Sequence, residues 1–154
     1  MHGFADASED AYGAVVYSRY GAVVYFRAKD FTGNVQITYI MAKTRVAPLK
    51  VISVALLELK AAHCLAKLTR YVTDAINNEL KFDRICLWSD SKIAPSWIAK
   101  PSSHWKTFVR NGVQEIHDLT SPNAWSNCPG TENPADLHSW GMSLKELKDS
   151  DIYW

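Results

Sequence analysis

The sequence predicts one mixed α/β domain of the α+β class, with a sheet of about five strands and helices on its faces. Stretches rich in β-branched and aromatic residues fill residues 1–46 without a helical pattern. After residue 53, segments with apolar residues at helical spacing alternate with short apolar runs, as in the βα units of a parallel sheet. The expected order is β-β-β-α-β-α-α-β-α, with the first three strands antiparallel and the later ones parallel.

Composition sets the size and class of the protein. The 154 residues are 47% hydrophobic and 12% aromatic, which suits a single domain over residues 1–154, with 142–154 as a C-terminal tail. Three cysteines lie far apart without a CxxC pair, which disfavours a zinc site and a disulfide framework. The sequence also lacks an apolar run long enough for a membrane span and an N-terminal signal sequence. We therefore expect an intracellular protein that is neither secreted nor membrane-bound.

The N-terminal strands include a duplicated octapeptide. Residues 2–7 form an apolar run that ends at an acid, and YGAVVYSR at 12–19 is followed by YGAVVYFR at 20–27. One strand through both copies would extend ~50 Å, which is long for a small domain. We therefore expect one copy to pair in the sheet and the other to fold back or bulge, although the sequence does not decide which. A turn at 30–34 then leads to a third strand at 35–46.

Helices and short strands alternate in the rest of the chain. The spacing of apolar residues predicts a helix from Val54 to about Ile76, with Ser53 as its N-cap. A strand at 84–88 leads through Ser91, a capping residue, into a helix at 92–99, which Pro95 should shorten or kink. A helix at 105–119, a short strand at 124–128, a turn at 129–130 and a final helix from 133–134 complete the expected elements.

Carboxylates at four positions carry the strongest chemical signal. Asp6 and Asp90 each follow a strand, Glu58 lies one turn into the long helix, and Asp136 opens the last helix. Any one of them alone is more simply explained as a helix cap or a solvated acid. Clustered carboxylates repel one another, so such a site favours a bound cation, and oxygen ligands suit Mg²⁺ or Mn²⁺. Two such ions about 3.5–4 Å apart can support hydrolysis of a phosphodiester.

Several strings in the chain resemble one family, in the family's order and over nearly the whole length. They are HGFADAS, AYGAVVY, AKTRVAPLK, LELKAA, WSDSKIAPSWI, HWKTFVRN, VQEIHDLT and ENPADLHSWG. The chain resembles the ribonuclease H domain of Pao/BEL-type long-terminal-repeat retrotransposons. The resemblance implies an RNase H-like fold, with Asp6, Glu58, Asp90 and Asp136 as the metal-binding and catalytic set. It also implies cleavage of RNA in RNA–DNA hybrids during reverse transcription, beside a reverse transcriptase domain if the chain is part of a polyprotein.

Some positions depart from the pattern of that family. Asn127 stands where the family has a His that aids proton transfer or product release, so Asn127 is kept as a catalytic candidate. Pro95 replaces a usual Leu, Gly112 replaces a usual Arg, and the octapeptide is doubled. These departures support a second hypothesis, a catalytically weak or inactive nucleic-acid-binding remnant of a retroelement.

Binding of a nucleic acid would depend on local groups, because the formal net charge is only +1. Candidates for phosphate contacts, for which ordinary surface solvation is the alternative, are Lys43, Arg45, Ser91, Lys106 and Arg110. An A-form-like hybrid is recognised by shape, so we expect little base specificity. We also expect a monomer and, since Met1 directly precedes the first strand, an isolated domain.

Other nuclease and hydrolase classes fit the sequence less well. A transposase or integrase core needs an acid on a late helix at a spacing that this chain lacks, since position 125 is Trp. An aspartic protease needs Asp-Thr/Ser-Gly, which neither Asp6 nor Asp90 provides, and the nucleophile motif GxSxG is absent.

Overall fold

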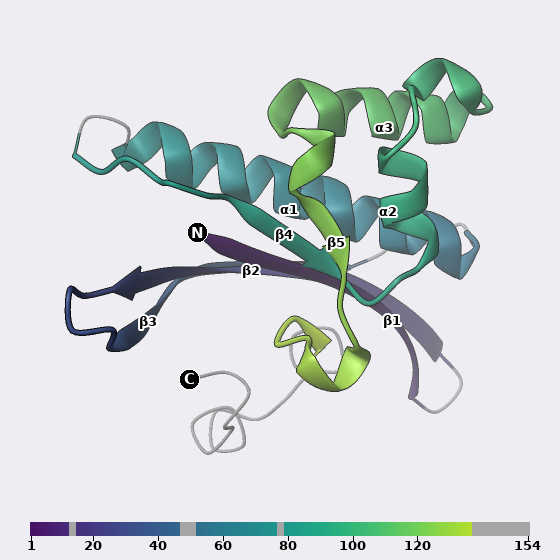
Figure 1. The fold of residues 1–154 in the computed structure, drawn as a ribbon. Coiled ribbons are helices and arrows are strands. Elements are labelled where there is room, and N and C mark those ends of the chain that lie inside the picture. The colour runs from purple at the N-terminus through teal and green to yellow at the C-terminus, as the bar shows by residue number, and fades with distance from the viewer. Residues whose placement is uncertain (13–14, 47–51, 77–78, 137–154) are drawn as a thin grey trace.

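The computed structural model has a five-stranded mixed sheet at its centre, in the order β3-β2-β1-β4-β5 (Figure 1). β1 (His2–Tyr12) pairs antiparallel with β2 (Val15–Lys29), and β2 pairs antiparallel with β3 (Val35–Val46). On its other edge β1 pairs parallel with β4 (Cys86–Ser89), and β4 pairs parallel with β5 (Trp125–Asn127). The predicted class and the change from antiparallel to parallel pairing are confirmed. The structure describes residues 1–12, 15–46, 52–76 and 79–136.

The duplicated octapeptide does not divide into a paired copy and an unpaired one. β2 contains the whole second copy and residues 15–19 of the first. Its residues 15–25 pair with β1, from Tyr12↔Val15 to His2↔Tyr25, and it also pairs with β3 along residues 19–29. The expectation that one copy would pair and the other would fold back or bulge holds only in part: the chain reverses between Tyr12 and Val15, within the first copy, but residues 15–19 of that copy also pair with β1. An eight-residue period preserves the alternation of side chains, so both copies can continue one strand when β1 is extended to match. Residues 13 and 14, inside the first copy, lie outside the described part of the chain.

The turn between β2 and β3 is built on Asp30. Its Oδ1 accepts hydrogen bonds from the backbone nitrogens of Thr32 (2.8 Å) and Asn34 (2.9 Å), and Gly33 has a φ of 95°. A positive φ strongly favours glycine, so the predicted turn at 30–34 is confirmed with a physical reason for its Gly. The strand that follows has the predicted bounds.

The three described α-helices lie on one face of the sheet (Figure 1). They are α1 (Val54–Ile76), α2 (Ile93–Ile98) and α3 (Thr107–Leu119). Short 3-10 turns lie at Ser102–His104, Pro122–Ala124 and Gly130–Glu132. The predicted final helix from 133–134 falls largely outside the described residues, which end at Asp136. None of the helices among the described residues is both long enough and apolar enough to cross a membrane.

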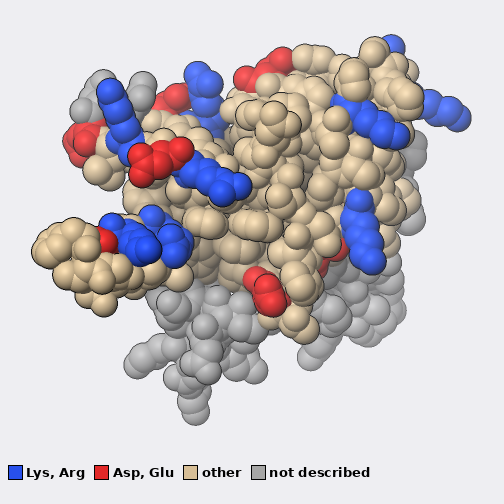
Figure 2. Space-filling model, in the orientation of Figure 1, with Lys and Arg blue, Asp and Glu red and all other residues tan. Residues whose placement is uncertain are grey.

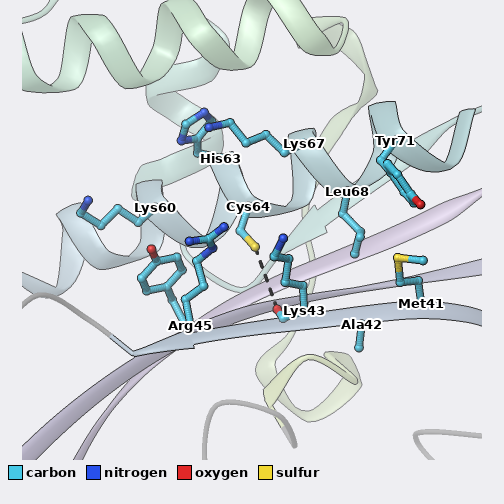
Figure 3. A pocket seen from close by; sticks show the side chains of 11 residues that line it. Met41, Ala42, Lys43, Arg45, Lys60, His63, Cys64, Lys67, Leu68 and Tyr71 are labelled. Carbon is cyan, nitrogen blue, oxygen red and sulfur yellow. Dashed lines mark hydrogen bonds between the residues drawn. The ribbon is translucent and has the colours of Figure 1, made fainter. Parts of the chain in front are cut away.

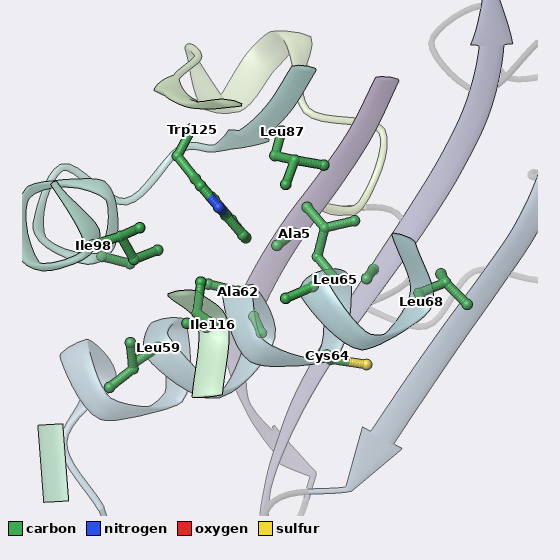
Figure 4. Packing of buried hydrophobic residues seen from close by; sticks show 14 of the residues in the cluster. Ala5, Leu59, Ala62, Cys64, Leu65, Leu68, Leu87, Ile98, Ile116 and Trp125 are labelled. Carbon is green, nitrogen blue, oxygen red and sulfur yellow. The ribbon is translucent and has the colours of Figure 1, made fainter. Parts of the chain in front are cut away.

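Helix α1 supplies more of the core than any other described element, and it packs one side against the sheet (Figure 4). Leu65 and Ala62 of α1 are fully buried, as are Ala5 of β1 and Leu87 of β4. Trp125 of β5 and Ile116 of α3 extend the same cluster. The side of α1 that carries Glu58 is therefore held firmly over β1 and β4.

The structure accommodates two of the departures from the family pattern, Pro95 and Gly112. Pro95 is the third residue of α2, in the first turn, where a missing backbone N–H removes no hydrogen bond within the helix. The six-residue length of α2 agrees with the predicted shortening. A Cβ at Gly112 would lie 3.0 Å from Cδ2 of Leu59, so the glycine lets α3 approach α1 closely.

Candidate active site

Asp6, Glu58 and Asp90 meet at one end of the parallel strands. In the register of β1 and β4, Ala5 pairs with Ser89. The two aspartates, Asp6 and Asp90, directly follow this pair, so they lie side by side at the end of the parallel pairing. Glu58 approaches from α1, in its second turn. One carboxylate oxygen from each acid lies within 4.8 Å of the others. The structure thus brings together three of the four acids that the sequence singled out.

The environment of these acids makes a full set of negative charges costly. Glu58 is 9% exposed and Asp6 is 3% exposed. Burial, followed by the charges of Asp6 and Asp90, raises the pKa of Glu58 to about 8. Oε2 of Glu58 and Oδ1 of Asp90 are buried without a hydrogen-bond partner. Buried polar atoms normally have partners, so these two oxygens and the oxygen-only donor set fit a hard divalent cation.

Asp136 approaches the same strand from the other face of the sheet. Asn133, only 1% exposed, donates from Nδ2 to the backbone oxygen of Ala5 at 3.1 Å, next to Asp6 in the chain. Ala135 packs on Val23 and Tyr25, opposite the α1 side. Asp136 itself is half-buried and is not part of the three-acid group within 4.8 Å. Its membership of a four-acid set stays a prediction.

Asn133 is a positioning residue that the sequence reasoning did not single out. Its Oδ1 accepts a hydrogen bond from the backbone nitrogen of Ala135 at 3.1 Å. Its backbone oxygen accepts one from the backbone nitrogen of Asp136, also at 3.1 Å. A single buried amide therefore fixes the start of the last helical segment to β1. The signal was available as an Asn directly before Pro at a helix start, a common capping context.

Asn127 holds the turn that carries Asp90. Its Nδ2 lies 3.0 Å from the backbone oxygens of Ser89 and Asp90 and 3.2 Å from that of Ser91. The structure therefore gives the side chain a positioning contact to the turn, while the catalytic role stays a prediction. An amide does not ionise near neutral pH, so it would not carry out the proton transfer for which the family's His is suited.

Cys128 lies buried beside the acids. Its backbone nitrogen donates to the oxygen of Ser89 at 3.0 Å. Burial, then the charges of Asp90 and Glu132, raises the pKa of its thiol to about 11. The thiol therefore stays protonated at neutral pH, and the donor set of the site remains one of carboxylate oxygens.

The candidate nucleic-acid contacts fall into separate places. Lys43 and Arg45 lie on β3 and line a groove against α1, while Lys106 directly precedes α3 and Arg110 lies within it. Ser91 uses its Oγ to accept from the nitrogens of Ile93 and Ala94, both at 3.2 Å, which confirms its capping role. In the view of Figure 2, basic side chains lie toward the edges of the face rather than as one band across it.

Solved structures of RNase H proteins share this fold. RNase H1 from the halophilic archaeon Halobacterium salinarum aligns with a TM-score of 0.55 and 16% identity, over 97% of this chain and 98% of that one. LC9-RNase H1, described as a type 1 RNase H with the type 2 active-site motif, aligns with a TM-score of 0.55 and 13% identity. The alignment covers 90% of this chain and 67% of that one. The N-terminal RNase H domain of a Mycobacterium tuberculosis protein aligns with a TM-score of 0.52 and 14% identity over 90% of each chain. At these identities the likeness shows the fold.

Sequence comparison adds the family. No curated protein matches the chain. The model of the family described as "Pao retrotransposon-like RNaseH-like domain" matches residues 18–91, which is just under half of the chain and includes Glu58 and Asp90. The resemblance drawn from the sequence motifs is thus confirmed: residues 18–91 match the model of that family, and the chain has the fold of the RNase H structures.

Proposed function

We propose that this domain is a metal-dependent ribonuclease H that hydrolyses the RNA strand of RNA–DNA hybrids. The observation that carries the proposal is the convergence of Asp6, Glu58 and Asp90 within 4.8 Å. The similarity to RNase H structures and the family match support the substrate class. Reverse transcription produces such hybrids, so a reverse transcriptase domain is the proposed partner and the interior of the cell the proposed location. We propose that the domain itself is a monomer.

The residues that would hold metal are Asp6, Glu58 and Asp90, with Asp136 as the proposed fourth ligand. Bound Mg²⁺ or Mn²⁺, two ions in this proposal, supplies an activated water and neutralises charge on the scissile phosphate. The protein fixes the acids before substrate arrives. β1 and β4 set the two aspartates, α1 sets Glu58, and the amide of Asn127 holds the turn of Asp90. Fixed, partly buried carboxylates need little reorganisation during the reaction.

Cleavage of a labelled hybrid tests the proposal. The wild type in Mg²⁺ or Mn²⁺ should cut the RNA strand of an RNA–DNA hybrid, leave the matching DNA duplex intact and lose activity in EDTA. Asp90→Asn keeps the size of the side chain and removes its charge, so we expect a loss of at least about a hundredfold. Asp118→Asn, which alters an exposed aspartate on α3, is the matched control and should cut normally.

The same assay decides the alternative of a catalytically weak or inactive binding remnant, which the Asn at position 127 favours. A remnant would bind the hybrid without metal-dependent cleavage, and Asp90→Asn would then behave as the wild type does. That result would rule out the enzymatic proposal.

A further inference from the structure

A basic groove runs between α1 and the edge strand β3, with a volume of about 540 Å³ (Figure 3). Among the described strands β3 pairs with β2 alone, so it is an edge strand of the described sheet. The cations and polar groups of the groove come from both walls. They include Lys43, Arg45, Lys60, Lys67 and Tyr71.

The charge of the groove is strongly positive. Lys43 and Arg45 are two residues apart on β3, so they share a face, and Figure 3 shows both pointing toward α1. Lys60 and Lys67 lie along the helix wall, and no acid is among the lining residues that the structure describes. Glu115 of α3 lies behind this wall, 3.9 Å from Nζ of Lys67. Lys60 lies with its Nζ 5.6 Å from the centre of the Phe108 ring, so two of the four cations have neighbours on α3, and Lys43 and Arg45 on β3 contribute most to the preference for anions.

The groove is separate from the acid site. An α-helix turns by about 100° per residue, so the nine residues from Glu58 to Lys67 amount to about two and a half turns and place the two side chains on opposite sides of α1. Glu58 is buried against the sheet, whereas Lys67 is exposed. A ligand in the groove would therefore not be held by the acids of the candidate active site.

The size and the aromatic residues of the groove indicate a single strand. A volume of about 540 Å³ is that of a small-molecule site, too small for a duplex. From Lys60 to Tyr71 the helix wall extends ~16 Å, a length that a few nucleotides can follow. Tyr71 is 62% exposed and offers a ring for base stacking. Cations that track a backbone beside aromatic rings are the usual features of single-strand binding.

We propose that the groove between α1 and β3 binds a short stretch of single-stranded nucleic acid, apart from the strand at the acids. The class of ligand rests on the proposed function, since hybrids made by reverse transcription have single-stranded flanks. Such binding would anchor a flank while the hybrid lies at the acids.

Fluorescence anisotropy with labelled oligodeoxythymidine, in EDTA, tests the groove. Lys43→Gln with Arg45→Gln should weaken binding roughly tenfold and lower the slope of log affinity against log salt by about 1.4, for two lost phosphate contacts. The matched control is Lys29→Gln with Lys81→Gln, two exposed lysines outside the lining of the groove. Unchanged affinity and slope in the first pair, or an equal loss in the control pair, would overturn the proposal.

A second variant keeps the test independent of charge. Tyr71→Ala removes an exposed ring and should weaken oligonucleotide binding several-fold with normal folding by circular dichroism. Binding equal to that of the wild type would count against the groove.

The two proposals fail in different ways. Asp90→Asn should abolish hybrid cleavage and leave oligonucleotide binding intact. A wild type that binds through the groove but never cleaves refutes the ribonuclease proposal alone, whereas normal cleavage with groove variants that bind normally refutes the groove alone.

Discussion

Replacing Glu58 with glutamine should stabilise the metal-free domain at neutral pH, although it removes a proposed metal ligand. The folded-state pKa of Glu58 is about 8, against an ordinary value of 4.5, chiefly because the carboxyl is buried. Between these pH values the folded chain holds a proton at Glu58 that the unfolded chain has released. The free energy of unfolding therefore falls as the pH rises through this window.

The magnitude follows from the size of the shift. pH 7 lies roughly 2.5 units above the ordinary pKa, and at about 1.36 kcal/mol per unit the buried carboxyl costs about 3 kcal/mol of stability. Glutamine carries no charge but still buries a polar group, so we expect Glu58→Gln to gain about 2 kcal/mol at pH 7. Near pH 5 the gain should almost vanish, because the pH is then close to the ordinary pKa of 4.5 and keeping the buried carboxyl protonated costs little relative to the unfolded chain.

Urea denaturation followed by tryptophan fluorescence, in EDTA, measures both effects. Glu79→Gln, at an exposed glutamate, is the control and should follow the wild type at each pH. Added Mg²⁺ should stabilise the wild type, since a ligand that binds the folded state raises its stability, and should stabilise Glu58→Gln less. If the free energy of unfolding depended on pH equally in the wild type and in Glu58→Gln, the raised pKa of a buried Glu58 would be refuted.

Three further substitutions test the supports of the site and the core. Asn133→Ala should cost about 2 kcal/mol of unfolding free energy and reduce hybrid cleavage, because the buried amide of Asn133 ties the segment before Asp136 to Ala5. The control Asn123→Ala, at an exposed position, should change neither the stability nor the cleavage. Asn127→Ala should weaken Mg²⁺ binding about tenfold in a calorimetric titration, because it frees the turn of Asp90, and unchanged affinity would argue against that support. Gly3→Ala should cost about 1–3 kcal/mol by thermal or urea melting, because its Cβ would lie 2.6 Å from Cδ1 of Leu65 in a filled core; a neutral result would contradict the packing.

The sequence predicted best where the pattern is local and long. α1 has the expected bounds because apolar residues recur at helical spacing through many turns, and β3 because alternation continues between two turn signals. The meeting of Asp6 and Asp90 was also predictable, since acids that directly follow paired residues of neighbouring parallel strands lie side by side at the end of that pairing.

Tertiary pairing decided the features that the sequence did not predict. β1 runs five residues beyond the expected end at Ala7, because the long antiparallel partner β2 pairs with its whole length. Asn133 is buried through a contact with Ala5, at the far end of the chain, and no local pattern reports such a contact. The placement of Lys43 and Arg45 in a groove on the opposite side of α1 from Glu58 likewise depends on the pairing of β3.

The central claim is that Asp6, Glu58 and Asp90 form a divalent-metal centre. A crystal structure determined in Mn²⁺, with the anomalous signal of the metal recorded, tests it most directly. The account predicts anomalous peaks bound by oxygens of these three carboxylates, lost in Asp90→Asn. Mn²⁺ bound only elsewhere on the chain, with the three acids left without metal, would contradict it.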